Sequence, residues 1–391
     1  MALIVQKYGG SSLASPKHIQ IAADRIKSLR SSGAEVVVVV SAMGHTTDHL
    51  LKLAAKTVKV PPSRELDMLL TAGERVSMSL LAMSLQEREV PAISFTGSQS
   101  GILTTSDHSQ AKILEIRPQR IQEELQKGKV VIIAGFQGVS REKEITTLGR
   151  GGSDTTAVAL AAALKAERCE ILTDVDGIFS ADPRIVTQAR LFNRLSYEEC
   201  LELASLGAKM QPRSIELARR FRVKVWIGSS QNIQGKGTKV GFEDEENKME
   251  KPLVKGIATK DGFHYFSTKL DLKTLAGFFQ QSGATLRFFN IGDGCTTFLC
   301  DESQVDSLRE LLKKSDSNFK EVKNVSTVSV VGEGVSNSKE LLPKCLSILE
   351  SLGQQSLIFA SNTLSLTLAV SSNQKALLTQ VLHQELIEKD L

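Results

Sequence analysis

A lysine and two glycines directly follow the first apolar run of this chain. Residues 3–6 predict a buried strand, and Lys7, Tyr8, Gly9 and Gly10 come next. Paired glycines let backbone N–H groups approach an anion closely, and a lysine adds a full positive charge. The pattern is typical of a phosphate-binding loop, although an ordinary tight turn with a solvated lysine has the same residues.

A second glycine-rich loop carries an arginine and an acid. Three glycines surround Arg150, and Ser153 and Asp154 follow before a helix of small residues expected at 157–164. One interpretation is that Ser153 or Asp154 simply caps this helix. We favour a binding loop, because a glycine-rich helix start can hold phosphate or carboxylate and an arginine can grip a carboxylate with two hydrogen bonds.

A third candidate loop spans residues 173–184. Its hydroxyl, acidic, aromatic and arginine side chains suit a nucleotide, with ribose and base contacts from the first half and phosphate charge from Arg184. The loop lacks the glycine and terminal glutamate of a calcium-binding EF-hand loop. The later run 235–238 is similar to the end of a P-loop, but Ser230 stands where the opening glycine is needed.

The three loops require strands that place them at one edge. From residue 1 to about 241, short β-branched runs alternate with helical stretches, which predicts a parallel sheet flanked by helices. In such sheets ligands bind at the carboxyl ends of the strands. We expect strands at residues 3–6, 35–41, 92–95, 130–134, 170–173 and 223–227.

The pattern changes after the acidic run 243–246, which we interpret as a solvated linker. Helices are expected at 272–282, 303–314, 339–352 and 374–385, alternating with strand pairs, and the unit occurs twice. This predicts two small α+β modules, which sense or assemble rather than catalyse.

Composition narrows the class of protein. The 391 residues are 41% hydrophobic and 24% charged, with a net charge of +4, which argues against nucleic acid as a partner. No stretch is long and apolar enough to cross a membrane, and no secretory signal begins the chain, so we expect a cytoplasmic protein. Five scattered cysteines form no metal-ligand pattern, and no metal site is predicted.

Taken together, the motifs resemble the aspartate kinases. The resemblance implies an α/β amino-acid-kinase fold, a three-layer sandwich with a largely parallel central sheet, followed by two ACT-like modules. It places the catalytic domain at 1–245 and the modules at 253–318 and 323–391. The motifs that carry it, in family order, are residues 7–12, 41–43 with Thr46 and Thr47, 71–74, 149–156, 173–184 and 207–209.

The same resemblance implies an activity. Aspartate kinases use ATP with Mg²⁺ to phosphorylate the side-chain carboxylate of L-aspartate, giving 4-phospho-L-aspartate, the first step toward lysine, threonine, methionine and diaminopimelate. Two alternatives stay open: another acyl-phosphate-forming kinase such as a glutamate kinase, and a catalytically idle amino-acid sensor. Lys7, Asp154 and Arg184 are all present, which argues against the sensor.

Roles for single residues follow from the resemblance only. Lys7 contacts the transferring phosphoryl group within the loop that includes Tyr8, and Gly9 and Gly10 supply backbone donors. Asp154 orients the lysines, and Lys209 bridges phosphates from the opposite side. Arg150 holds the substrate α-carboxylate and Glu74 its ammonium group. The remaining expected contacts are Ser41, Thr47, Gly151 and Ser153 for the substrate, and Thr173, Asp174, Phe179, Asp182 and Arg184 for the nucleotide.

The chain departs from the family pattern at two places. The loop after Lys209 is one residue short and has no histidine before Pro212. In the modules, Asp271 is not followed by the usual Pro-Gly, and Glu340 stands where a glycine is expected, so its side chain is a candidate to fill the effector pocket. We therefore expect weak or altered inhibition by lysine or threonine, and a homodimer or larger homo-oligomer formed through the sheets of the modules.

Overall fold

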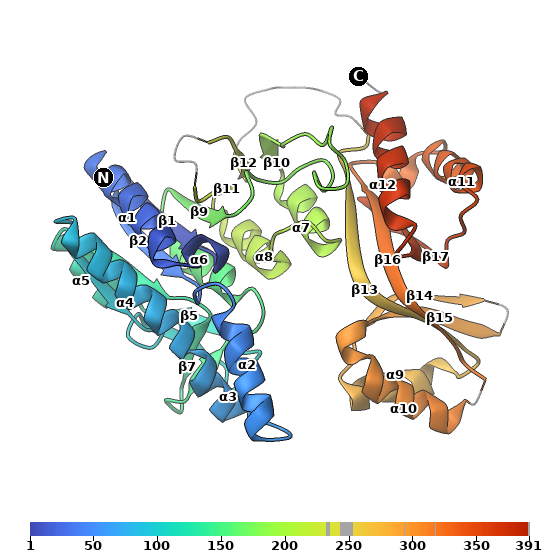
Figure 1. Cartoon of the computed structure of the whole chain (residues 1–391), viewed down its shortest axis with the longest axis horizontal. Coiled ribbons are helices and arrows are strands. Elements are labelled where there is room, and N and C mark those ends of the chain that lie inside the picture. Colours follow the sequence, from blue (N-terminus) through green and yellow to red (C-terminus); the bar gives the residue numbers. More distant parts are fainter. Residues whose placement is uncertain (232–234, 243–252, 293, 317, 390–391) are drawn as a thin grey trace. The chain divides into compact units, whose positions relative to one another are not determined.

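The computed structural model describes residues 1–231, 235–242, 253–292, 294–316 and 318–389, and the acidic run interpreted as a linker lies outside them. The chain forms two compact units (Figure 1). The N-terminal unit contains Met1–Ile178, Leu191–Leu201 and Gln211–Glu245. The C-terminal unit contains Phe179–Arg190, Glu202–Met210 and Glu246–Leu391. Two short segments that lie within the sequence range of the N-terminal unit therefore belong to the C-terminal unit.

An eight-stranded sheet forms the centre of the N-terminal unit. All neighbouring strands in it are parallel except one pair, β11 (Val225–Ser229) and β12 (Gly237–Val240). Each of the six expected strands is present, and the largely parallel sheet is confirmed. Its order is β10 (Arg194–Leu195), β12 (Gly237–Val240), β11 (Val225–Ser229), β9 (Arg168–Thr173), β1 (Leu3–Tyr8), β2 (Glu35–Val40), β6 (Val130–Ala134), β3 (Ala92–Phe95).

Helices cover both faces of this sheet, because alternate residues of its buried strands point to opposite sides. Val36, Val38 and Val40 of β2 pack in one apolar cluster with α1 (Pro16–Ser31) and α4 (Ala72–Glu87). On the other face, α6 (Gly152–Ala163) packs against β1 and β2, and α8 (Pro212–Phe221) packs against α6. No described helix is long and apolar enough to cross a membrane.

A small four-stranded sheet also belongs to the N-terminal unit and was not expected from the sequence. Its order is β5 (Ile113–Ile116), β4 (Ile102–Thr104), β7 (Gln137–Ser140), β8 (Ile145–Thr147). The strand β8 contacts α3 (Ser63–Leu70) and leads into the glycine-rich loop before α6. The other helical elements are η1 (Ser11–Leu13), α2 (Thr46–Thr57), α5 (Gln119–Gln126) and α7 (Tyr197–Ser205), the last shared between the two units.

The C-terminal unit contains one antiparallel six-stranded sheet. A β-α-β-β-α order occurs twice, and the long strands β13 and β16 pair at the centre, so both modules share the sheet. The two α+β modules expected from the repeat are confirmed. The order is β14 (Leu286–Gly292), β15 (Cys295–Asp301), β13 (Gly256–Thr268), β16 (Lys320–Val331), β18 (Ser365–Ser371), β17 (Ile358–Ser361), with α9 (Leu272–Ser282), α10 (Val305–Ser315), α11 (Leu341–Ser351), α12 (Lys375–His383) and the short turns η2 (Glu302–Gln304), η3 (Val335–Asn337) and η4 (Gln384–Glu388).

Candidate active site

The central feature of the site is an ion pair between Lys7 and Asp154. Lys7 is the penultimate residue of β1, and its Nζ lies 2.6 Å from Oδ1 of Asp154 in the first turn of α6. Gly151 occupies the N-cap position and no side chain among the described residues caps the helix, so the alternative that Ser153 or Asp154 merely caps α6 is wrong. The two side chains are only 12% and 14% exposed. Lys7 is therefore held in place at the carboxyl end of the sheet.

The glycine loop after β1 is packed closely against the loop after β2. A Cβ built on Gly10 would lie 2.9 Å from the carbonyl oxygen of Ala42 and 3.1 Å from that of Gly44, so only glycine allows this approach. The Gly44 N–H donates to the Gly10 carbonyl at 3.0 Å. The Gly9 N–H donates to the carbonyl of Leu172 at 3.2 Å. The donor expected at Gly9 is thus engaged within the sheet.

Tyr8 faces away from this loop. Strand alternation places its side chain opposite that of Lys7, where it is fully buried in the cluster between the sheet and α1. Its hydroxyl donates to Oε1 of Gln6 at 3.2 Å, and burial raises the pKa of the Tyr8 phenol. Only the backbone of Tyr8 is available to the site, so the nucleotide-binding role expected for Tyr8 falls to its main chain and stays a prediction.

A second carboxylate, Glu74, is buried at the start of α4. It is 3% exposed, and its Oε1 accepts a hydrogen bond from the Ala42 N–H at 3.2 Å. Within the described part of the chain, Oε2 has no hydrogen-bond partner. Burial raises the pKa of Glu74 from 4.5 to about 7. A buried carboxylate with one unused oxygen is suited to a cationic ligand group; the neighbouring Ser41 and Thr47 are half-buried.

The arginine loop lies between β8 and α6. The Arg150 side chain is exposed. The backbone carbonyl of Arg150 accepts a hydrogen bond from Nε2 of Gln211 at 2.6 Å. A Cβ on Gly151 would lie 2.6 Å from Cδ of the same glutamine. Gln211 stands in the shortened loop and was not expected in the site; its position next to Pro212 at the start of α8 is the only sequence signal. Ser153, also expected there, is 7% exposed in the first turn of α6.

The expected nucleotide residues fall into two groups. Thr173 ends β9, and its Oγ1 donates to Oδ1 of Asp174 at 2.9 Å, both within the N-terminal unit. The other four, Phe179, Asp182, Arg184 and Lys209, belong to the C-terminal unit, and their roles stay predictions.

Within the C-terminal unit, the segment that carries three of these residues has its own supports. Arg184 pairs with Asp182 at 2.6 Å, and this contact holds the pKa of the Asp182 carboxyl below its usual value. Oγ of Ser180 accepts from the Arg190 N–H and lies 2.9 Å from Nε2 of the buried His383. The Ser180 carbonyl also accepts from the Ile257 N–H at 2.6 Å.

The two residues that depart from the family pattern in the modules each stand directly before a helix. The Asp271 side chain caps α9 by accepting from the N–H groups of Lys273 and Thr274, each at 3.0 Å. Glu340 is exposed ahead of α11, and the expectation that its side chain fills an effector pocket stays a prediction.

The sequence profile of the amino acid kinase family matches residues 2–229. The sheet order and the charged site therefore stand in a member of this class of protein. The aspartokinase of Corynebacterium efficiens is 41% identical over 413 aligned positions, covering 98% of this chain and 96% of the relative. The chain therefore belongs to the aspartokinases within that family. The aspartokinase of Mycobacterium bovis is 55% identical over 260 positions, covering 66% of this chain and 62% of its own.

A solved structure agrees with the fold along the whole chain. Escherichia coli aspartokinase III in complex with aspartate and ADP superposes with a TM-score of 0.83 at 24% sequence identity, covering 98% of this chain and 99% of the other. The aspartate kinase of Synechocystis is 35% identical with a TM-score of 0.57, covering 98% of this chain and 69% of its own.

Proposed function

We propose that this chain transfers the γ-phosphoryl group of ATP to the side-chain carboxylate of L-aspartate, giving 4-phospho-L-aspartate and ADP. The observation that carries the proposal is a lysine held by Asp154 beside a glycine loop, in the same site as a buried Glu74 oxygen that has no hydrogen-bond partner among the described residues. The first suits a phosphoryl group, and the second suits the ammonium group of an amino acid. Relatives that match over nearly the whole chain are named aspartokinases.

The chemistry of the proposed step explains why charged side chains dominate the site. A carboxylate is already ionised at neutral pH, so the nucleophile needs no general base. The obstacle is repulsion between the carboxylate and the triphosphate, which are both anions. Lys7 places a positive charge at the end of β1, and Asp154 fixes the direction of its ammonium group at 2.6 Å. The main contribution of the protein is therefore positioning and charge stabilisation.

The substrate contacts are proposed from two charged side chains of the N-terminal unit, one for the carboxylate and one for the ammonium group of the amino acid. Arg150 holds the α-carboxylate of aspartate, because an exposed guanidinium can form a bidentate pair. Glu74 holds the ammonium group through Oε2, which accepts no hydrogen bond from the described part of the chain. Ser41, Thr47, Gly151 and Ser153 complete this side of the site. With the α-carboxylate and the ammonium group both held, the side-chain carboxylate of aspartate is directed toward Lys7.

The nucleotide contacts are proposed for Thr173 and Asp174 at the end of β9 and for Phe179, Asp182, Arg184 and Lys209. The close approach at Gly10 fixes the loop after β1 against the loop after β2, directly beyond Lys7. The Mg²⁺ that accompanies ATP neutralises part of the phosphate charge and is held by phosphate oxygens.

Assembly and regulation are also proposed through the C-terminal unit. The edge strand β14 exposes Phe289 (54%) and Ile291 (53%), and an apolar sheet edge of this kind pairs readily with another chain. We propose that a second copy covers it, giving a homodimer. Escherichia coli aspartokinase III has also been solved with lysine and aspartate; for the present chain we propose weak or altered inhibition by lysine or threonine.

A hydroxylamine trap tests the activity. An acyl phosphate reacts with hydroxylamine to give a hydroxamate, whose ferric complex is coloured. The purified chain with ATP, Mg²⁺ and hydroxylamine is expected to give hydroxamate with L-aspartate and far less with L-glutamate. A glutamate preference would identify the other acyl-phosphate kinase, and no product with either would indicate a sensor without activity. Omission of the amino acid provides the blank for ATP hydrolysis.

A further inference from the structure

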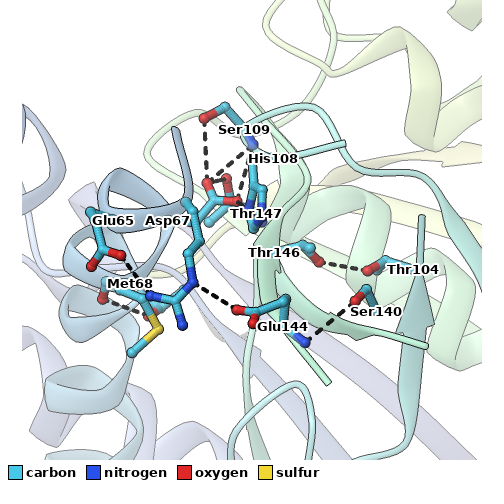
Figure 2. A network of polar contacts seen from close by, with 12 residues as sticks. Glu65, Asp67, Met68, Thr104, His108, Ser109, Ser140, Glu144, Thr146 and Thr147 are labelled. Atoms are coloured by element: carbon cyan, nitrogen blue, oxygen red, sulfur yellow. Dashed lines mark hydrogen bonds and ion pairs between the residues drawn. The ribbon is translucent and has the colours of Figure 1, made fainter. Parts of the chain in front are cut away.

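A carboxylate that the proposed reaction does not use is completely buried in the N-terminal unit. Asp67 of α3 has no exposed side-chain surface, and its oxygens accept hydrogen bonds from three neighbouring residues (Figure 2). Thr147 donates through Oγ1 at 2.6 Å and through its N–H at 3.1 Å. The Ser109 N–H lies 3.1 Å from both oxygens, and Nδ1 of His108 lies 2.8 Å from Oδ2.

Burial of this carboxylate requires an explanation. A carboxylate removed from water is costly unless donors surround it, and here they do. Attachment of α3 to the four-stranded sheet does not require a buried charge, because the half-exposed Arg64 already bridges α3 to Glu144 with a contact of 2.8 Å (Nε–Oε2). Asp67 is therefore distinguished by the residues that donate hydrogen bonds to it.

These groups flank the arginine loop. Thr147 ends β8, and Leu148, Gly149 and Arg150 follow it directly. Gly149 has a positive φ of 78°, and a Cβ there would lie 3.0 Å from the carbonyl oxygen of Ser109. The segment around Ser109 thus lies against the arginine loop, and one carboxylate binds both.

A charge of the opposite sign joins the same two segments. The guanidinium of Arg213, on α8, donates from NH1 to the Leu148 carbonyl and from NH2 to the Ala111 carbonyl, both at 3.0 Å. The Ala111 N–H in turn donates to the Thr147 carbonyl at 2.9 Å. Asp67 and Arg213 therefore hold segments 108–111 and 147–149 together.

We propose that Asp67 and Arg213 are positioning residues for the amino-acid substrate: by fixing segments 108–111 and 147–149, they set the place of Arg150 and Gly151 and hence the affinity for the substrate α-carboxylate. The inference rests on the proposed function, in which Arg150 binds that carboxylate. Neither residue needs to touch a substrate.

The test is a comparison of Michaelis constants in the full-length chain. Asp67→Asn keeps the size of the side chain but turns an NH₂ donor toward the N–H groups of Ser109 and Thr147. The KM for aspartate is expected to rise at least about tenfold, because a small displacement of a binding group has a large effect, while the KM for ATP changes less than about twofold. Arg213→Met, which removes the positive charge that joins the same two segments, is also expected to raise the KM for aspartate and to leave the KM for ATP nearly unchanged.

Two control variants remove contacts of the same sheet without touching the loop segments. Thr104→Val breaks the buried hydroxyl pair between Thr104 and Thr146, whose oxygens are 2.5 Å apart, and Arg64→Ala breaks the surface bridge to Glu144. Both are expected to lower the melting temperature and leave the two KM values in their wild-type ratio. If Asp67→Asn does not fold, Thr147→Val is the milder variant, because it removes one donor and keeps the carboxylate.

The outcomes separate the inference from the proposed function. A selective rise in the aspartate KM in the Asp67 or Thr147 variant and in the Arg213 variant, absent from the controls, supports the inference. The double variant of Asp67 and Arg213 should then have less than the product of the single effects, because both act on one loop. Parallel changes in both KM values, or the same split in the controls, would overturn it. No aspartate-dependent turnover in the wild type would refute the proposed function itself.

Discussion

Glu74→Gln is predicted to stabilise the chain and to weaken aspartate binding at the same time. The Glu74 carboxyl is 3% exposed, and burial raises its pKa from 4.5 to about 7. The folded state therefore favours the protonated carboxyl. Between pH 4.5 and about 7 the folded chain binds a proton that the unfolded chain has released, so this group lowers stability as the pH rises through that window.

The magnitude follows from the size of the pKa shift. At 1.36 kcal/mol per pKa unit, the shift corresponds to roughly 3 kcal/mol of unfolding free energy above pH 7. The introduced amide has no charge, so it recovers this energy in part; its NH₂ group replaces an oxygen that has no partner in the described structure, which reduces the gain. We expect the variant to be about 1–3 kcal/mol more stable than the wild type at pH 8.5 and nearly equal at pH 4.5.

The assay is urea unfolding of the substrate-free protein at the two pH values. The chain has a single tryptophan, Trp226 of β11, which packs against the core of the N-terminal unit and reports its unfolding by fluorescence. The aspartate KM of the same variant should rise by about 10- to 100-fold, because a neutral amide binds an ammonium group less well than a carboxylate. A variant less stable than the wild type at pH 8.5 would refute the burial argument, and an unchanged aspartate KM would refute the ligand role.

Three further predictions concern the same site. Lys7→Ala should lower kcat by at least about 100-fold, since it removes the charge paired with Asp154; near-normal turnover in a folded variant, checked by circular dichroism, would remove Lys7 from the mechanism. Arg150→Ala should raise the KM for aspartate far more than that for ATP, and equal effects in steady-state assays would contradict its role. In the wild type, the aspartate KM should rise about tenfold per pH unit below about 7, because protonated Glu74 no longer attracts ammonium; a flat profile would disagree.

Much of the fold could be predicted because its signals are local. The five valines of β2 indicate a strand buried on both faces, and the observed strand Glu35–Val40 lies between two helical layers. The four-stranded sheet escaped prediction because β4 and β8 have only three residues each, too few for a clear alternation. The repeat in the second half was readable because four amphipathic helices recur in the same order.

The site was predicted less completely, for reasons that depend on contacts between distant residues. Lys7 and Asp154 were found because each belongs to a glycine-rich loop at the end of a strand. The burial of the Tyr8 side chain was not predicted, because β1 continues to residue 8, two residues beyond the expected end, and alternation then turns the tyrosine into the core. The assignment of Phe179–Arg190 to the C-terminal unit depends on contacts such as Ser180 with His383, which no local pattern contains.

Asp67 shows what a sequence pattern could have indicated. It is an acid on the buried side of a helix, three residues before the buried Leu70, and a buried carboxylate is unusual enough to suggest a specific partner. The partners, Ser109 and Thr147, are 42 and 80 residues away in the chain, so only the structure identifies them.

The central claim is that the phosphoryl group goes to the side-chain carboxylate of aspartate. Phosphorus NMR tests it directly with L-aspartate labelled with carbon-13 only at the side-chain carboxyl carbon, in a reaction with ATP and Mg²⁺. We predict an acyl-phosphate signal that is split by coupling to this label and unsplit when only the α-carboxyl carbon is labelled. Absence of an acyl-phosphate signal, or splitting by the α-carboxyl label, would contradict the account.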